Sequence, residues 1–352
     1  MSTRLDDFDG LLRWGPLADW IDAHAEQLPG EGAVSAVRAL AGGTQNAIFL
    51  VERRGGSFVL RRPPRHLRAN SNETMQREAR VLAALAGTAV PHPHLYAACG
   101  DPEVIGACFY AMEVIDGFSG LRDLPPRYRA DPEWVRQMPI ALVDAAAQLA
   151  SIDPIAAGLA DFGRADGWLE RQATRWRRQL DSYSQLPGYE GPEIPGVDEV
   201  GKWLDEHRPP TCRIGIIHGD LQWANVMFAY DSPRLVAIVD WELSTLGDPL
   251  LDLGWILQSI SEPGDPPGHS GLLPDHEGLP PRQELVARYA EVSGRDVTDI
   301  NWFFVLACYK LGIILEGTWA RALAGQAPRD IGEQLHAYTL WLFAKARQLI
   351  DA

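Results

Sequence analysis

Four polar residues within residues 214–242 have types and spacing that suit phosphoryl transfer. His218 and Asp220 follow an apolar run, Asn225 comes after a loop of four residues, and Asp240 ends a second apolar run. An amide and a carboxylate oxygen can share one hard cation that completes its shell with waters and substrate phosphates. Asp220 lies on the loop before that pair, where it can take a proton from a hydroxyl beside the phosphate.

The pairing of Asn225 with Asp240 depends on a hairpin. Two apolar runs flank the turn residues Asp-Ser-Pro at 231–233, which predicts two antiparallel strands. If a loop at 231–234 closes the hairpin, Asn225 faces Asp240, and opposed residues have Cβ atoms about 4.5–5.5 Å apart. The alternative is a hairpin whose polar residues only cap strand ends, which one triplet alone would leave open.

The pattern His-x-Asp-x4-Asn, followed by Asp at a strand end, resembles the protein kinase-like superfamily and its aminoglycoside phosphotransferase branch. The resemblance implies an α+β, two-lobed protein kinase-like fold, with a small antiparallel-sheet N-lobe and a mainly helical C-lobe. It also implies ATP and Mg²⁺ as cofactors. Asp220 is then the catalytic base, and Asn225 and Asp240 are the metal ligands. His218 is a supporting residue that Asp252, one turn into a helix, is expected to orient.

Composition fits a globular enzyme. The 352 residues are 46% hydrophobic and 22% charged, enough for two lobes. The net charge of −15 argues against nucleic acid as a partner, while an acidic surface suits either a cationic substrate or plain solubility. No signal h-region or membrane run is predicted, and four scattered cysteines indicate a reducing compartment. We therefore expect a cytoplasmic protein, off the membrane, with a small-molecule partner.

The N-terminal part has the order of a kinase small lobe. A helix over residues 1–30 is expected to precede strands at 34–40, 47–52 and 57–62. Between the first two strands, Gly42, Gly43, Thr44 and Asn46 form a loop whose backbone N–H groups can approach phosphates. Any tight hairpin could use the same residues, but the position at the first hairpin favours a nucleotide loop.

The third strand departs from the kinase pattern, because arginine stands where kinases place lysine. By alternation Val59 and Arg61 share a face, so Val59 would touch adenine and Arg61 the phosphates. Arg62 takes the role if the register is off by one, and both arginines could instead be surface charges. In kinases a glutamate on the following helix pairs with this basic residue, so the resemblance implies that Glu78, on the helix predicted at 74–86, pairs with Arg61. The competing interpretation is an exposed salt bridge with a neighbouring arginine.

Residues 104–117 resemble a strand pair that leads into a kinase hinge. Met112 would lie behind the adenine, and backbone groups of Glu113 and Ile115 would bind its edge. We therefore predict an N-lobe of residues 1–114 and a C-lobe of residues 115–352.

The C-lobe is predicted to be helical at 133–152, 168–186, 198–207, 282–293, 300–324 and 331–350. Residues 261–281 are rich in proline and glycine and suit a lid over the acceptor. Lys310 and Arg321 share one helix face, where they either pair with acidic core residues or meet an anionic substrate.

The runs at 59–64, 77–82 and 308–321 are similar to the phosphotransferase domain fused to some acyl-CoA dehydrogenases. This resemblance implies a kinase acting on a hydroxyl of a small molecule, such as a hydroxyacyl-CoA or hydroxy acid. A true aminoglycoside phosphotransferase and a nucleotide-binding pseudokinase remain as alternatives. The acceptor, the choice between ATP and GTP and the oligomeric state stay open.

Overall fold

The computed structural model describes residues 8, 10–40, 46–120, 124–260, 262–266 and 278–351. Its chain divides into two compact units. Unit one comprises Met1–Gly117, Ala157–Leu159 and Val236–Ser244, and unit two comprises Phe118–Ala156, Ala160–Leu235 and Thr245–Ala352. The break at 117/118 lies near the predicted lobe boundary. The return of residues 236–244 to unit one brings Asp240 into the unit that holds Arg61 and Glu78.

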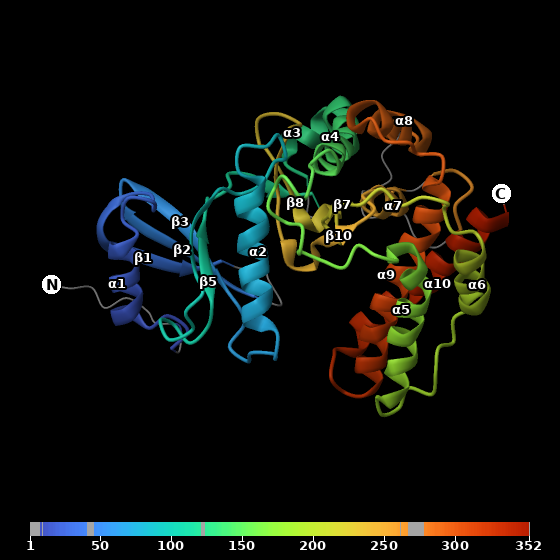
Figure 1. Ribbon diagram of the computed structural model, residues 1–352, viewed down its shortest axis with the longest axis horizontal. Coiled ribbons are helices and arrows are strands. Elements are labelled where there is room, and N and C mark those ends of the chain that lie inside the picture. The colour runs from blue at the N-terminus through green and yellow to red at the C-terminus, as the bar shows by residue number, and fades with distance from the viewer. Residues whose placement is uncertain are drawn as a thin grey trace. The chain divides into compact units, whose positions relative to one another are not determined.

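Unit one is built on an antiparallel sheet with strand order β1-β2-β3-β5-β4 (Figure 1). Its elements are α1 (Trp14–Ala23), β1 (Glu31–Ala39), β2 (Ala47–Arg54), β3 (Gly56–Arg62), α2 (Ser71–Leu85), β4 (Leu95–Cys99), β5 (Phe109–Met112) and the 3₁₀ turn η3 (Trp241–Leu243). Alternation along β2 and β3 buries Phe49, Val51, Phe58 and Leu60 in one apolar core together with α1. Helix α2 packs against β4, β5 and η3.

Two predictions for this unit are wrong in detail. The N-terminal helix is Trp14–Ala23 and does not extend over residues 1–30. Turns and bends follow Ala23, so the helix ends before Pro29 and Gly30. The strand pair predicted within 104–117 is a single strand, β5, whose neighbours are β3 and β4. Residues 104–106 form a turn that places Gly106 at φ 83°, a backbone angle that favours glycine.

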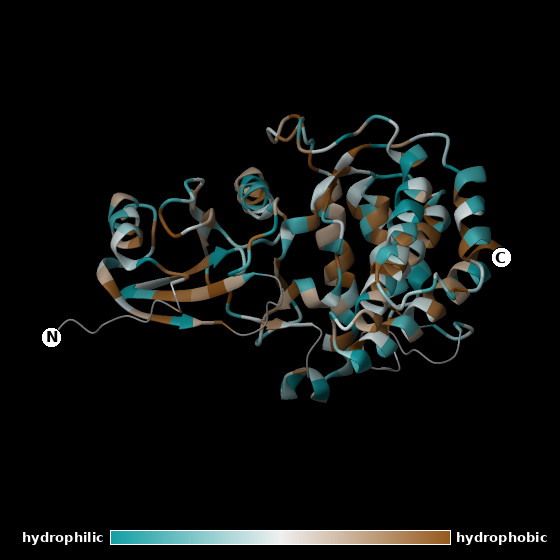
Figure 2. Cartoon of the chain, turned by 90° about the horizontal axis from the view of Figure 1, so that it is seen from below, coloured by the Kyte–Doolittle hydropathy of each residue, from teal (hydrophilic) through white to brown (hydrophobic). Residues whose placement is uncertain are grey.

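Unit two is mostly helical. Its helices are α3 (Pro126–Ala130), α4 (Pro132–Ala150), α5 (Trp168–Ser182), α6 (Val197–Glu206), α7 (Leu250–Gln258), α8 (Arg282–Ser293), α9 (Ile300–Leu323) and α10 (Arg329–Asp351), with 3₁₀ turns η1 (Tyr183–Gln185) and η2 (Trp223–Asn225). Helix α9 packs against α5, α6, α7 and α10 (Figure 1). The helices in Figure 2 alternate between brown and teal along their turns, the pattern of amphipathic helices. Each helix predicted for this part is present, and its ends lie within a few residues of the predicted ones.

Helix α9 is also long and apolar enough to cross a membrane, by length and composition alone. However, 78% of its most apolar window is buried inside the protein. Its close approach to α7 explains one glycine: a Cβ at Gly254 would lie 2.6 Å from the carbonyl oxygen of Phe303. We interpret α9 as the central core helix of unit two.

Short strands lie directly before or after His218, Asn225 and Asp240 or within a few residues of them. Strand β7 (Gly215–Ile217) pairs with β10 (Thr245–Gly247), and a second small sheet has the order β6 (Phe118–Ser119), β8 (Val226–Phe228), β9 (Leu235–Ile238). The N–H of Ala229 donates to the carbonyl of Arg234 at 3.0 Å. Ala229 and Arg234 therefore close the hairpin, whereas a loop at 231–234 would have been closed by residues 230 and 235. The register in which Asn225 faces Asp240 is wrong, because residue 230 belongs to the turn.

Candidate active site

A buried arginine bridges two carboxylates in unit one. Arg61 Nε lies 3.0 Å from Glu78 Oε2, and Arg61 Nη2 donates to Asp240 Oδ1 at 2.6 Å. Arg61 is only 6% exposed and Glu78 is fully buried, so the alternatives of surface arginines and an exposed salt bridge are wrong. The predicted ion pair of Arg61 with Glu78 is present, and Asp240 joins it.

Charge balance explains why this buried group holds together. Burial alone would lower the pKa of Arg61, but Tyr110, Glu78 and Asp240 raise it above the ordinary value, so the guanidinium stays charged. Burial raises the pKa of Glu78, whereas Arg61 and the hydroxyl of Tyr110, which donates to Glu78 Oε2 at 2.9 Å, lower it. Buried charges persist when they are paired and hydrogen-bonded in this way.

The neighbouring arginine has a different task. Arg62 donates to the backbone carbonyls of Leu11, Pro63 and Ile105, at 2.5, 3.1 and 3.1 Å. Strand alternation sends it to the face opposite Arg61, where it ties the start of the chain to the sheet. Of the two arginines, Arg61 is therefore the one that pairs with Glu78, as the resemblance to kinases implied.

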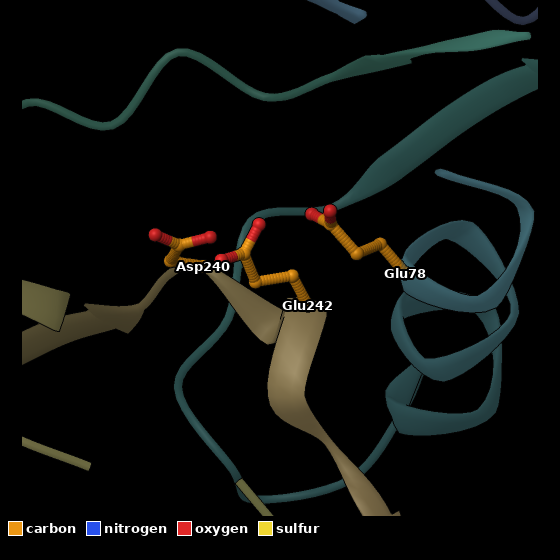
Figure 3. A group of neighbouring side chains, drawn as sticks. All are labelled: Glu78, Asp240 and Glu242. Carbon is orange, nitrogen blue, oxygen red and sulfur yellow. The ribbon is translucent and has the colours of Figure 1, made fainter. Parts of the chain in front are cut away.

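Asp240 has an unusual backbone. It adopts φ 65° and ψ 63°, in the left-handed region that non-glycine residues seldom occupy. The 3₁₀ turn that follows brings Glu242 back beside it. Figure 3 shows the carboxylates of Glu78, on α2, and of Asp240 and Glu242 approaching one another. One oxygen from each lies within 4.8 Å of the others.

The three carboxylates fit a magnesium ion. All donors are hard oxygens, which Mg²⁺ prefers, and it is commonly held by one or two carboxylates together with substrate phosphates. Glu78 Oε1 is buried and accepts no hydrogen bond from the residues that the structure describes, which leaves one acceptor in the cluster to be satisfied. Sequence reasoning had missed Glu242, although its spacing of two residues from Asp240 was visible.

The remaining predicted nucleotide residues are also in unit one. Asn46 donates to Glu242 Oε2 at 3.4 Å, whereas Gly42, Gly43 and Thr44 lie outside the described residues. Val59 and Met112 are directly paired between β3 and β5.

The predicted hinge continues from Met112. The N–H of Glu113 donates to the carbonyl of His94 at 2.8 Å, and Ile115 is half-buried three residues after Met112. Glu113 would therefore offer adenine its carbonyl oxygen, while the nucleotide roles of both residues remain predictions.

The loop that holds Asp220, the base expected from the sequence, lies in unit two directly after β7. Each oxygen of the Asp220 carboxylate accepts an amide N–H: Oδ1 from Gln222 at 2.9 Å and Oδ2 from Asn225 at 2.8 Å. Asn225 also donates to the Asp220 carbonyl at 2.9 Å. These contacts fix the orientation of the carboxylate, as a group that receives a proton requires.

Asp252 supports this loop through the backbone. Its oxygens accept the N–H of His218 at 2.7 Å and that of Gly219 at 2.9 Å. Asp248 accepts the N–H of Leu250 at 3.1 Å at the start of α7. The expected support of His218 by Asp252 is thus present, and it acts on the main chain.

Burial dominates the electrostatics of the loop. Burial raises the pKa of Asp220, against the lowering effects of His218, Gln222 and Lys310. The pKa of Asp252 is raised by burial too, although His218 and the two backbone donors oppose the shift. The protonation of Asp220 on the loop and of Asp252 on α7 therefore depends on the groups that are held beside them.

Curated relatives share most of this chain. An acyl-CoA dehydrogenase family member 11 from Gallus gallus is 33% identical over 314 residues, which are 85% of this chain and 38% of that protein. The chain thus spans less than two-fifths of that relative's length.

Solved structures share the fold. A Ralstonia eutropha protein assigned as a candidate aminoglycoside phosphotransferase superposes with a TM-score of 0.77 at 30% identity, covering 98% of this chain and 99% of the other. An aminoglycoside phosphotransferase in a ternary complex with streptomycin and ATP has a TM-score of 0.55 at 14% identity, over 85% of this chain and 89% of that one. The α+β, protein kinase-like fold expected from the sequence is confirmed.

A family model described as the phosphotransferase enzyme family matches residues 36–291. This match includes parts of both units, with Arg61, Glu78, Asp220, Asn225, Asp240, Glu242 and Asp252 among its residues. The chain belongs to the phosphotransferase enzyme family.

Proposed function

We propose that this chain transfers the terminal phosphoryl group of Mg·ATP to a hydroxyl group of a small molecule. The observation that carries the proposal is the buried Arg61, held by Glu78 and Asp240. The resemblance to kinases assigns the contact with the phosphates to this residue. Family membership supports a phosphotransferase, and the ATP complex of a structural neighbour supports the donor.

On this proposal the phosphates of ATP meet unit one through Arg61. Its guanidinium is already oriented by two carboxylates and keeps its charge, so it can bind phosphate oxygens through a planar fork. Asp240 and Glu242 of unit one would hold Mg²⁺. The sequence resemblance also assigns Asn225 as a metal ligand. The metal would neutralise charge on the transferred group.

Asp220 would act on the acceptor. A substrate hydroxyl donates its proton to the Asp220 carboxylate as its oxygen forms a bond to phosphorus, and the bond from phosphorus to the ADP oxygen breaks. Gln222 and Asn225 keep the carboxylate oriented for that proton. Such positioning contributes about 10²–10⁴ in rate. The joint action of Asp220 and Arg61 on one substrate is part of the proposal.

The acceptor that we favour is a hydroxyacyl-CoA or a hydroxy acid. Its support is that the matching relatives are named acyl-CoA dehydrogenase family members, of which this chain covers one part. An aminoglycoside is the second candidate, supported by the Ralstonia eutropha structure.

A panel of acceptors tests the proposal. ADP release from Mg·ATP would be measured with hydroxy acids, their CoA thioesters and aminoglycosides. We expect release above the acceptor-free rate with the first two groups only. Stimulation by aminoglycosides alone would replace the favoured acceptor, and binding of Mg·ATP without release for any acceptor would support a pseudokinase.

A further inference from the structure

Lys310 is a buried cation without a role in the reaction proposed above. It lies in the middle of α9, is 6% exposed, and its Nζ donates to the carbonyl oxygen of Gly219 at 2.5 Å. The ammonium also lies over the ring of Trp255, 4.3 Å from the centroid, and 5.6 Å from that of Trp176. A buried ammonium is costly unless it is hydrogen-bonded and near opposite charge, so this arrangement calls for an explanation.

The residue that Lys310 contacts is the turning point of the catalytic loop. Gly219 has φ 83°, in the left-handed region where a side chain would add strain. Its N–H donates to Asp252 Oδ1 on α7, and its carbonyl accepts from Lys310 on α9. One residue is thus held on both of its polar groups by side chains of opposite charge from two packed helices.

The contacts of Asp252 and Lys310 with Gly219, here called the clamp, constrain the backbone of Asp220 through one peptide group. The Gly219 carbonyl belongs to the peptide group that joins Gly219 to Asp220, so fixing the carbonyl fixes the direction in which Asp220 leaves the loop. Gln222 and Asn225 then orient the carboxylate itself. Without Lys310, the backbone hydrogen bonds of Asp252 would hold only the N-terminal side of Gly219.

The charges around Lys310 agree with this arrangement. Burial lowers the pKa of Lys310 to about 8, with Asp220 and Asp252 opposing the shift and Arg175 adding to it. The ammonium therefore lies near two acidic side chains, Asp252 of the clamp and Asp220 of the proposed reaction.

We propose that Lys310 is a positioning residue, which sets the orientation of Asp220 by clamping the left-handed Gly219 between α9 and α7. The inference rests on the proposed function for its catalytic part and on the backbone geometry for the clamp itself. A lysine that served only to fill the core would affect stability without a selective effect on the loop or on turnover.

The test compares Lys310→Met with Lys345→Met in the full chain. Lys345 is a matched control, since it is a second buried lysine beside an aromatic ring, paired with Asp265 on another part of unit two. Hydrogen exchange followed by mass spectrometry reports on the loop peptide 215–226 without any acceptor. We expect the Gly219–Asn225 amides to exchange at least about 10-fold faster in Lys310→Met and at the wild-type rate in Lys345→Met.

Turnover gives the second readout. With Mg·ATP and an acceptor from the panel that the wild type phosphorylates, we expect kcat of Lys310→Met to fall about 10²-fold while the KM for ATP changes less than about 2-fold. Lys310→Arg, which keeps a cationic donor, should recover part of the loss. If Lys310→Met fails to fold, Lys310→Gln is measured in its place.

The two readouts separate the two proposals. Wild-type loop exchange in the Lys310 variants would overturn the clamp, and so would an equal loss of turnover in the Lys345 variant. Faster loop exchange in Lys310→Met, combined with a wild-type protein that phosphorylates no acceptor, would leave the clamp standing and contradict the proposed function.

Discussion

Arg61 Nη2 donates to Asp240 Oδ1 at 2.6 Å, which joins the third strand of the sheet to a left-handed residue near η3. The same guanidinium is paired with the fully buried Glu78. The arginine is thus oriented by two carboxylates before any nucleotide binds. This relationship supports Arg61 as the phosphate-binding cation in place of lysine.

Arg61→Ala should weaken ATP binding while adenosine binding stays the same, because only the phosphates would contact the guanidinium. The variant should also be less stable by about 3–5 kcal/mol, since Glu78 loses its buried partner. Arg61→Lys should restore part of both losses, with the charge but without the fork. Calorimetric titrations with ATP and with adenosine, together with chemical denaturation, measure the two effects.

Arg54→Ala is the control for this experiment, because Arg54 is exposed and forms its ion pair with Glu31, which is also exposed. It should bind ATP as the wild type does. Equal ATP affinity in Arg61→Ala and wild type would exclude Arg61 from the phosphate site.

Glu242→Gln should reduce the gain in nucleotide affinity that Mg²⁺ provides, because an amide binds the ion less strongly than a carboxylate. Affinity for ATP in the presence of EDTA should hardly change. Titrations with and without Mg²⁺ give the difference. A Mg²⁺ effect of wild-type size would remove Glu242 from the set of ligands.

Asp240 allows the strain of its backbone to be measured. Asp240→Ala and Asp240→Gly both lose the carboxylate, but only glycine relieves the left-handed conformation at φ 65°. The glycine variant should therefore be more stable than the alanine variant by about 1 kcal/mol. Denaturant titrations of the pair test this order, and an alanine variant of equal or greater stability would contradict it.

Strand alternation was sufficient to predict the most specific feature of unit one. Val59 and Arg61 share a face and Arg62 takes the other, as a period of 2 residues requires. The pairing of Arg61 with Glu78 was expected from the kinase resemblance and not from periodicity. Turns were harder to predict. Closure at Ala229 and Arg234 shifted the hairpin by one residue on each strand.

Two contacts between residues distant in sequence could not be predicted from local sequence patterns. Glu242 joins the carboxylate cluster only because Asp240 adopts a left-handed conformation before a 3₁₀ turn. Lys310 reaches Gly219 from a helix 91 residues away in sequence. Neither contact follows from the periodicity of its own segment.

Lys310 should make stability depend on pH in a defined direction. Its pKa is lowered from 10.5 to about 8, so the unfolded chain binds more protons than the folded one between these values. The free energy of unfolding of the wild type, relative to Lys310→Met, should therefore rise as pH increases from 8 towards 10.5. The full rise is about 3 kcal/mol, at 1.36 kcal/mol per pKa unit.

The difference between the two proteins removes the contribution of the other groups that titrate in this range. The titratable and charged neighbours of Lys310 are Asp220, Asp252 and Arg175. Denaturation curves at several pH values supply the data. A flat difference would show that Lys310 keeps an ordinary pKa, and a difference that falls with pH would show that its pKa is raised.

The central claim is that Asp220 promotes transfer of a phosphoryl group from Mg·ATP to a small-molecule hydroxyl. Phosphorus NMR of wild type and Asp220→Asn, each with Mg·ATP and the best acceptor of the panel, tests it most directly. We predict a new phosphomonoester resonance with the wild type, formed about 10²–10⁴ times more slowly by Asp220→Asn, although the variant binds ATP normally. Formation of that resonance at similar rates by both proteins, or of inorganic phosphate alone by the wild type, would contradict the claim.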